Sequence, residues 1–162
     1  MKIAVIGSGS WGCAISAVLA NKGNDVCLWS YFQEESDALK TNRENKKNLP
    51  GLILPDNITF TSDLEAAVRG RSVIVMVTPS AAVGDTARKM RPYVESGAAI
   101  VCASKGFDSE TQKTLTQTIE DHIPNALVAA LSGPSHAEEV AKQKPTTLVA
   151  ASRNLTAAKM LQ

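Results

Sequence analysis

The chain alternates short apolar runs with longer amphipathic segments. Residues 1–6 form an apolar run that stops at glycine, and residues 73–77 contain only Val, Ile and Met. Short continuous apolar runs bounded by turn residues are typical of strands that are buried on both faces. The pattern predicts seven strands, at 1–6, 25–29, 58–60, 73–77, 98–103, 126–131 and 146–151.

The segments between the predicted strands carry helix signals. Residues 11–21 are rich in Ala and Leu, and Gly23 follows them as a stop signal. Ser62 and Glu65 have the spacing of a capping box, and Pro79 suits the first position of a helix. The predicted helices are 11–21, 33–42, a short one opened by 62–65, one from Pro79, 109–122, 134–142, and a last one capped by Asn154.

This alternation predicts an α/β fold with a doubly wound parallel sheet. Parallel strands need crossover connections, and helical crossovers cover both faces of the sheet. The 162 residues, of which 44% are hydrophobic, suffice for one domain with a core that needs no disulfide bonds. We therefore expect one domain over residues 1–162.

Charge and cysteine content narrow the function classes. Lys and Arg number 17 and Asp and Glu 16, which leaves a net charge of +1 and no basic surplus for nucleic acid. Cys13, Cys27 and Cys102 are widely spaced, as expected for free thiols in a reducing cytoplasm. The two histidines have no cysteine at ligand spacing, and the apolar runs are short. We expect a cytoplasmic protein with no nucleic-acid partner, no membrane segment and no metal.

A glycine-rich loop follows the first predicted strand and opens the first predicted helix. Gly7 permits the tight turn, Gly9 lets a pyrophosphate approach the backbone, and Gly12 lets the helix pack on the sheet. The helix N-terminus offers free N–H groups to phosphates. This context predicts dinucleotide binding on a Rossmann fold, and the alternative is a turn that serves packing only. The G-x-G-x-x-G motif reads Gly7-Ser8-Gly9-Ser10-Trp11-Gly12.

The end of the second predicted strand leaves the choice between NAD and NADP open. A carboxylate about 20 residues past the glycines would bind the ribose 2′-hydroxyl of NAD. That position falls near Trp29, where the following residues include no carboxylate at the strand end and no Arg or Lys. Tyr31 and Phe32 are candidates to flank the adenine or ribose; alternatively, they pack over the helix below.

Two later segments lie at the ends of predicted strands, where ligands bind in open α/β sheets. Lys105, within Ser-Lys-Gly, suits a phosphate or a carbonyl oxygen, or is a solvated loop lysine. Ser135, in the segment 131–139, contacts a ligand or caps the next helix. A Ser135–His136 hydrolase is disfavoured because the chain has no G-x-S-x-G elbow.

The motifs together resemble the amino-terminal domain of bacterial NAD(P)-dependent glycerol-3-phosphate dehydrogenases. The resemblance implies reversible hydride transfer between dihydroxyacetone phosphate and sn-glycerol 3-phosphate, which feeds glycerophospholipid synthesis. The cofactor would be NAD or NADP, and the partner a small phosphorylated substrate. The matching segments are 5–12, 43–45, 49–51, 54–58, 104–106, 132–135 and 137–139.

The same resemblance implies roles for individual residues. Lys105 would contact both cofactor and substrate, and Gly133 and Ser135 would contact substrate. The implied cofactor contacts beside the three glycines are Ser10, Trp11, Tyr31 and the backbone of Ala137.

The end of the chain reads as an unfinished helix. Residues 156–162 carry no stop signal, and family members continue into a second, helical domain that contains the general acid/base lysine. We therefore expect that the substrate domain is absent, that these residues include no general acid, and that they turn over little substrate. The full-length protein is compatible with a homodimer. The open alternatives are a non-catalytic dinucleotide-sensing module and a reductase of another hydroxy acid on this fold.

Overall fold

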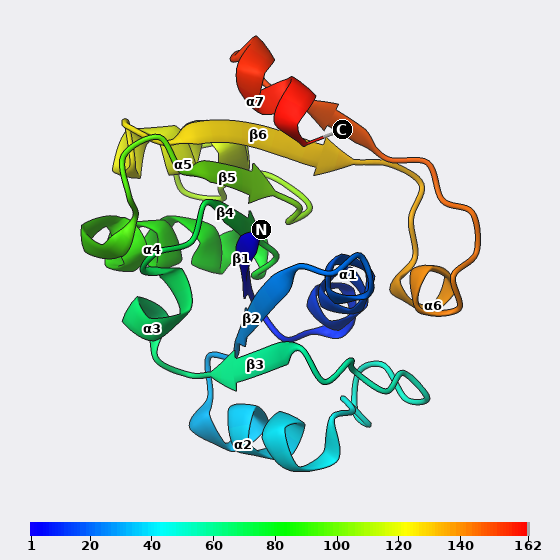
Figure 1. Ribbon diagram of the computed structural model, residues 1–162. Coiled ribbons are helices and arrows are strands. Elements are labelled where there is room, and N and C mark those ends of the chain that lie inside the picture. The colour runs from blue at the N-terminus through cyan, green and yellow to red at the C-terminus, as the bar shows by residue number, and fades with distance from the viewer. Residues whose placement is uncertain (162) are drawn as a thin grey trace.

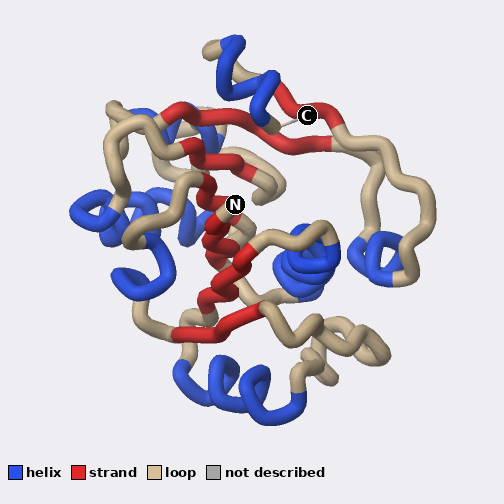
Figure 2. Tube along the Cα trace, in the orientation of Figure 1, coloured by secondary structure: helices blue, strands red, loops and turns tan. Residues whose placement is uncertain are grey.

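The computed structural model describes residues 1–161 and contains one seven-stranded sheet with helices on both faces (Figure 1). The strand order is β3-β2-β1-β4-β5-β6-β7. Figure 2 shows the strands stacked through the middle of the molecule. The strands are β1 Lys2–Ile6, β2 Asp25–Trp29, β3 Ile58–Thr61, β4 Val73–Met76, β5 Ala99–Cys102, β6 Leu127–Ser132 and β7 Val149–Ala151.

The helices divide between the two faces of the sheet. In Figure 1, α1 and α6 lie together on one side, and α3, α4 and α5 lie on the other. A short 3₁₀ turn, η1 Arg91–Tyr93, follows α4. The helices are α1 Ser10–Asn21, α2 Gln33–Asn42, α3 Leu64–Val68, α4 Ser80–Met90, α5 Leu115–His122, α6 Ala137–Ala141 and α7 Leu155–Met160.

Side chains of the central strands alternate between two apolar cores. Val5 and Leu28 belong to the core under α1 and α6, whereas Ile6 and Met76 belong to the core under α3, α4 and α5. All four are at most 5% exposed. Burial on both faces is confirmed for the first strand after Lys2, and it holds for β2 after Asp25 and throughout β4 and β5, whereas β7 is mainly exposed. This burial explains why the central runs are apolar.

The strand register brings four strand ends to one edge of the sheet. Ile6 lies beside Trp29 on one side and Met76 on the other, and Met76 lies beside Cys102. The chain reverses its direction of winding between β1 and β4, which is the switch point where ligands bind in such sheets. The glycine-rich loop therefore leaves β1 at that crevice.

Three predictions of local structure were wrong. The last strand is antiparallel, with Ser132 paired to Val149, so the sheet is not wholly parallel. The predicted helix 109–122 begins only at Leu115, because the Asp108 carboxylate accepts hydrogen bonds from two backbone N–H groups and holds the preceding residues in turns. The predicted helix 134–142 is confined to Ala137–Ala141.

The helix caps also differ in part from the sequence signals. Asp63, rather than Ser62, caps α3, and Ser62 Oγ donates instead to Gln33. Pro79 stands at the cap position of α4 rather than at its first helical residue. Asn154 caps α7 through its side chain, as predicted. A full capping box does occur, at Thr114 with Gln117.

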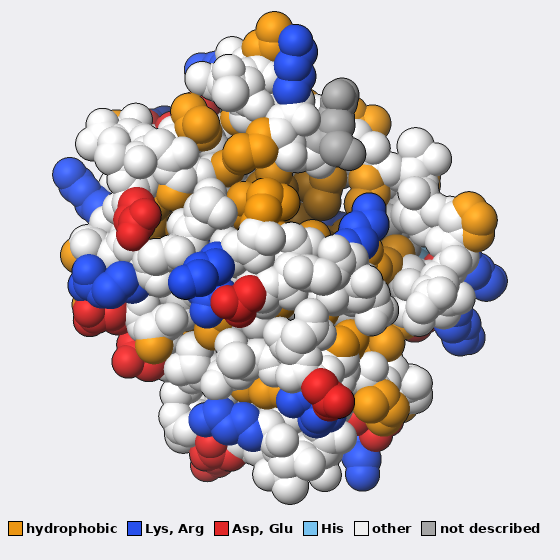
Figure 3. All heavy atoms as spheres, viewed as in Figure 1, with side chains coloured by type: hydrophobic (Ala, Val, Ile, Leu, Met, Phe, Trp, Pro, Cys, Tyr) orange, Lys and Arg blue, Asp and Glu red, His pale blue; other side chains and the backbone are white. Residues whose placement is uncertain are grey.

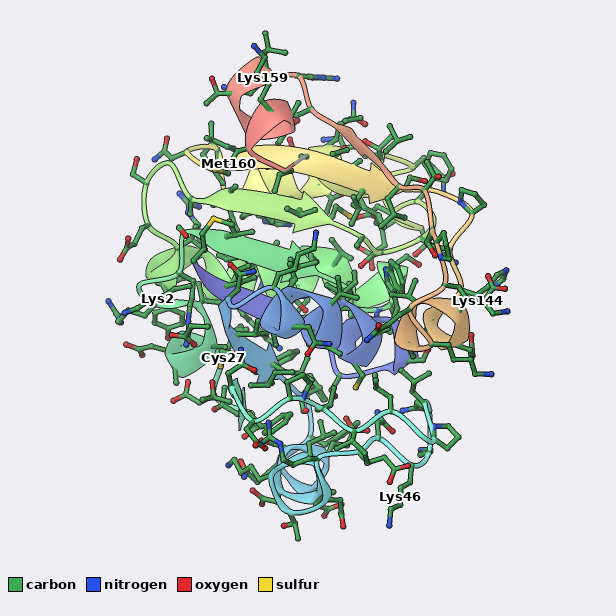
Figure 4. All side chains as sticks on the ribbon, turned by 45° about the vertical axis from the view of Figure 1, so that its right-hand side comes forward. Lys2, Cys27, Lys46, Lys144, Lys159 and Met160 are labelled. Atoms are coloured by element: carbon green, nitrogen blue, oxygen red, sulfur yellow. The ribbon has the colours of Figure 1, made fainter. Side chains whose placement is uncertain are left out.

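Charged side chains of both signs are interspersed over the face in Figure 3, and apolar side chains gather below α7. Lys46, Lys144 and Lys159 extend from separate parts of the molecule in Figure 4. Within residues 1–161, no helix is both long and apolar enough to cross a membrane. Over the same range, no three His, Cys, Asp or Glu side chains are grouped as metal ligands.

Candidate functional site

The glycine-rich loop is in steric contact with both its own helix and the neighbouring strand end. Gly7 has a φ of +123°, and a Cβ there would lie 2.9 Å from the Val77 carbonyl oxygen. A Cβ on Gly12 would lie 1.9 Å from the Gly7 carbonyl oxygen. The predicted roles of these two glycines in the turn and in close packing therefore agree with the structure.

Gly9 differs from its two neighbours because a Cβ at this position would meet no atom within 4 Å. It is the N-cap residue of α1, and in the described part of the chain no side chain caps this helix end. Its position lines a cavity of about 910 Å³, here called the first cavity. The first N–H groups of α1 and the open space beside Gly9 together suit an anionic group.

Hydrogen bonds to the Ser8 carbonyl oxygen hold the glycine-rich loop in place. Asn45 Nδ2 donates to the Ser8 carbonyl oxygen at 2.7 Å, and Cys13 Sγ donates to the same oxygen at 3.3 Å. Nearby in the same loop, Arg43 Nε donates to the Leu54 carbonyl oxygen at 3.0 Å. The long loop between α2 and β3 is thereby fastened to the first helix.

The far end of the first cavity carries aromatic side chains and an ion pair. Tyr31 and Phe32, both exposed, meet edge to face with ring centroids 4.9 Å apart. Asp85 and Lys89 of α4 also line this cavity, and their charged atoms lie 2.6 Å apart. This pairing lowers the pKa of Asp85 and raises the pKa of Lys89.

Lys105 lies where two cavities meet. It lines the first cavity and also a smaller one of about 350 Å³, here called the second cavity. Gly133 and Ser135 line the second cavity, and Ser135 is only 8% exposed. Ser104 Oγ donates to the Thr78 carbonyl oxygen at 2.6 Å and so ties the Lys105 loop to the end of β4. Among residues 1–161, Lys105 is therefore the one lysine that lines both of these cavities.

The structure brings most of the sequence-predicted site residues together. Trp11 and Lys105 line both cavities, and Gly133 and Ser135 line the second. Ala137 lies in the apolar core and lines neither cavity, so its backbone contact stays a prediction. The predicted site residues that line the first cavity are Gly7, Gly9, Ser10, Trp11, Gly12, Tyr31 and Lys105.

Three polar residues of the site had no predicted role, although Asn45 lies in the segment 43–45 that matches the family. Thr78 lines the first cavity, and its buried Oγ1 finds no hydrogen-bond partner among residues 1–161. Glu35 accepts a hydrogen bond from Ser8 Oγ at 3.3 Å. Asn45 Nδ2 donates a hydrogen bond to the carbonyl oxygen of Ser8. Only the fold of the loop between α2 and β3 brings Asn45 to Ser8, 37 residues away.

We expect the three cysteines to resist thiol reagents in the native chain. Burial raises the pKa of Cys13 from 9.0 to about 11, and burial also raises the pKa of Cys27, seen against the sheet in Figure 4, and of Cys102. Since the thiolate is the reactive form, labelling of Cys13 by a disulfide reagent at pH 8 should be about 100-fold slower than in denaturant, and labelling of Cys27 and Cys102 should also be slower. Rapid native labelling of any one thiol would contradict this.

The same shifts predict loss of stability in alkali. The unfolded thiols ionise near their ordinary pKa of 9.0, whereas the folded Cys13 thiol stays protonated up to about 11. The Cys13 contribution is therefore complete below pH 9 and declines as the pH rises toward 11. Urea unfolding at pH 8 and pH 10.5, with Cys13→Ala as the matched control, measures it.

Comparisons with known proteins give one consistent result. The family described as NAD-dependent glycerol-3-phosphate dehydrogenase N-terminus matches residues 2–158. Glycerol-3-phosphate dehydrogenase (NAD(P)+) from Agathobacter rectalis is 44% identical over 99% of this chain and 48% of its own length. The protein of the same name from Moorella thermoacetica is 45% identical with the same coverage. The crystal structure of glycerol-3-phosphate dehydrogenase from Coxiella burnetii superposes with a TM-score of 0.93 at 34% identity, over 99% of this chain and 49% of that one.

The sheet order, the switch point and the glycine-rich loop define a Rossmann-type domain, as predicted. Within that class, the chain belongs to the family of NAD-dependent glycerol-3-phosphate dehydrogenase N-terminal domains. The sequence resemblance to this family is confirmed. The chain spans about half the length of the curated relatives it matches.

Proposed function

We propose that this chain is the cofactor-binding half of an enzyme that transfers a hydride between NAD(P)H and dihydroxyacetone phosphate, giving sn-glycerol 3-phosphate for glycerophospholipid synthesis. The observation that carries the proposal is that Lys105 lines both cavities. The names of the relatives supply the substrate class. The relatives' length supports a second domain that completes the enzyme.

The first cavity fits a dinucleotide on two observations from this chain. The space beside Gly9 is open, so a pyrophosphate can reach the backbone N–H groups at the start of α1. Thr78 Oγ1 is buried at the cavity without a partner among the described residues, which suits a hydroxyl or amide of a ligand. Ser10, Trp11, Tyr31 and the backbone of Ala137 are the other proposed contacts.

The reaction chemistry gives Lys105 a role in stabilising negative charge on the substrate. The nicotinamide, when bound, supplies the hydride. Reduction of the ketone builds negative charge on its oxygen, and the Lys105 ammonium stabilises that charge or the substrate phosphate next to it. Gly133 and Ser135 in the second cavity hold the substrate against Lys105. The proton for the product oxygen comes from a lysine in the second domain, outside this chain.

Titration of the purified chain with NADH and NADPH tests the proposal. We expect saturable binding of at least one of them, followed by ligand fluorescence and calorimetry, because the dinucleotide-binding cavity lies wholly within this chain. Absence of binding up to millimolar concentration would overturn the proposal. Assay of the full-length chain with dihydroxyacetone phosphate against a panel of keto acids separates it from a hydroxy-acid reductase. Binding without turnover of any of these by the full-length chain would instead favour a sensing module.

We also propose a cytoplasmic location, supported by three buried cysteines that are all free. A homodimer of the full-length protein stays a prediction.

A further inference from the structure

Glu35 places a carboxylate in contact with Ser8 in the glycine-rich loop. It lies in the first turn of α2, on the wall of the first cavity. Its Oε2 accepts a hydrogen bond from Ser8 Oγ at 3.3 Å, and Ser8 itself is buried. The side chain is otherwise exposed, so the carboxylate is held over the loop rather than in the core.

Glu35 supplies a carboxylate near the glycine-rich loop, which the residues at the end of β2 do not. In Rossmann domains, a carboxylate near that strand end binds the ribose 2′-hydroxyl beside the glycine-rich loop. Here β2 ends at Trp29 and is followed by Ser30, Tyr31 and Phe32. Glu35 comes from the next helix yet reaches Ser8 in the loop, so it presents an acceptor to the same region.

The other charges on the first cavity do not offset this carboxylate. Lys89 is the cation on the α4 wall, and its ammonium is already paired with Asp85 at 2.6 Å. Lys105 follows β5, two strands away from β1 in the sheet order, and opens onto the second cavity. Lys46 and Lys47 line a neighbouring cavity together with Glu35, but they do not line the first cavity, and among residues 1–161 no ion pair to Glu35 forms.

We propose that Glu35 determines cofactor specificity by accepting a hydrogen bond from an adenosine ribose hydroxyl and repelling a 2′-phosphate, so that this chain favours NADH over NADPH. This inference rests on the proposed dinucleotide-binding function. Discrimination by a like charge is a common form of specificity, because the wrong ligand brings a repulsion that the right ligand lacks. A phosphate dianion beside an ionised carboxylate must also lose water without gaining a partner.

The test compares Glu35→Gln with Glu34→Gln. Both substitutions remove one negative charge from the first turn of α2, but Glu34 does not line the first cavity. Dissociation constants for NADH and NADPH are measured by fluorescence titration for the wild type and both variants. The pair 5′-AMP and adenosine 2′,5′-bisphosphate is titrated by calorimetry, because it isolates the effect of the 2′-phosphate.

We expect the wild-type chain to bind NADH at least about tenfold more tightly than NADPH, a difference of about 1.4 kcal/mol. Glu35→Gln should reduce that ratio to about twofold or less, mainly by strengthening NADPH, with the same change in the nucleotide pair. Glu34→Gln should keep the wild-type ratio. Equal wild-type affinities, or an equal ratio in Glu35→Gln, would overturn the inference and leave the proposed function standing. Failure of the wild type to bind either dinucleotide would overturn both.

Discussion

Gly9→Val is expected to abolish dinucleotide binding and to leave the fold unchanged. Gly9 has φ −65° and ψ −176°, a conformation that valine adopts readily. A Cβ there meets no protein atom within 4 Å, so the valine side chain occupies only open space at the first cavity. That space is where a pyrophosphate must approach the N–H groups of α1.

The measurement pairs affinity with stability. We expect the dissociation constant for NADH to rise at least about 100-fold, which corresponds to about 2.7 kcal/mol of binding free energy. The midpoint of thermal unfolding without ligand should stay within about 2 °C of the wild type, since surface changes of this kind are nearly neutral. Gly9→Ala, with a smaller side chain, should give an intermediate loss. If Gly9→Val bound NADH with wild-type affinity, the pyrophosphate could not bind at this loop as proposed.

The fold could be predicted because its information is local. Residues 73–77 are apolar at every position, and β4 is buried at every residue from Val73 to Met76. The direction of the last strand could not be predicted, because it does not depend on the residues of that strand alone. The last four residues of the segment 146–151 are apolar, as in the other predicted strands, and only the path of the chain through α6 makes β7 antiparallel to β6. The prediction that Ser62 caps α3 was wrong for a related reason, since its hydroxyl hydrogen-bonds to Gln33, 29 residues earlier in the chain.

The site was predictable where one motif carries one chemical task. The glycines and Lys105 fall at strand ends, and a strand end implies a place at the ligand-binding edge. Glu35 and Asn45 were not predictable, because each acts on Ser8 across 27 and 37 residues. The residues at the end of β2 include no carboxylate, whereas the structure places the Glu35 carboxylate on the following helix. Counting along the sequence cannot locate a side chain that reaches its site from another element.

Gly12→Ala, unlike Gly9→Val, is expected to destabilise the fold itself. A Cβ on Gly12 would lie 1.9 Å from the Gly7 carbonyl oxygen and 3.1 Å from a methyl group of Val77. The first obstacle is backbone, so it cannot rotate away, and α1 must move off β1 and β4. Such overpacking costs about 3 kcal/mol, which for a chain of this length lowers the unfolding midpoint by roughly 6–12 °C.

Gly9→Ala is the matched control, because it adds the same methyl group three residues earlier in the same loop. Urea unfolding should show a stability near that of the wild type for Gly9→Ala and a large loss for Gly12→Ala, with similar m-values. Saturating NADH should stabilise the wild type by mass action and Gly12→Ala much less, because the displaced helix no longer presents its N–H groups correctly. If Gly12→Ala has the same midpoint of urea unfolding as the wild type, the packing of α1 on the sheet does not depend on close contact with Gly7. The binding site would then tolerate a looser loop than the structure describes.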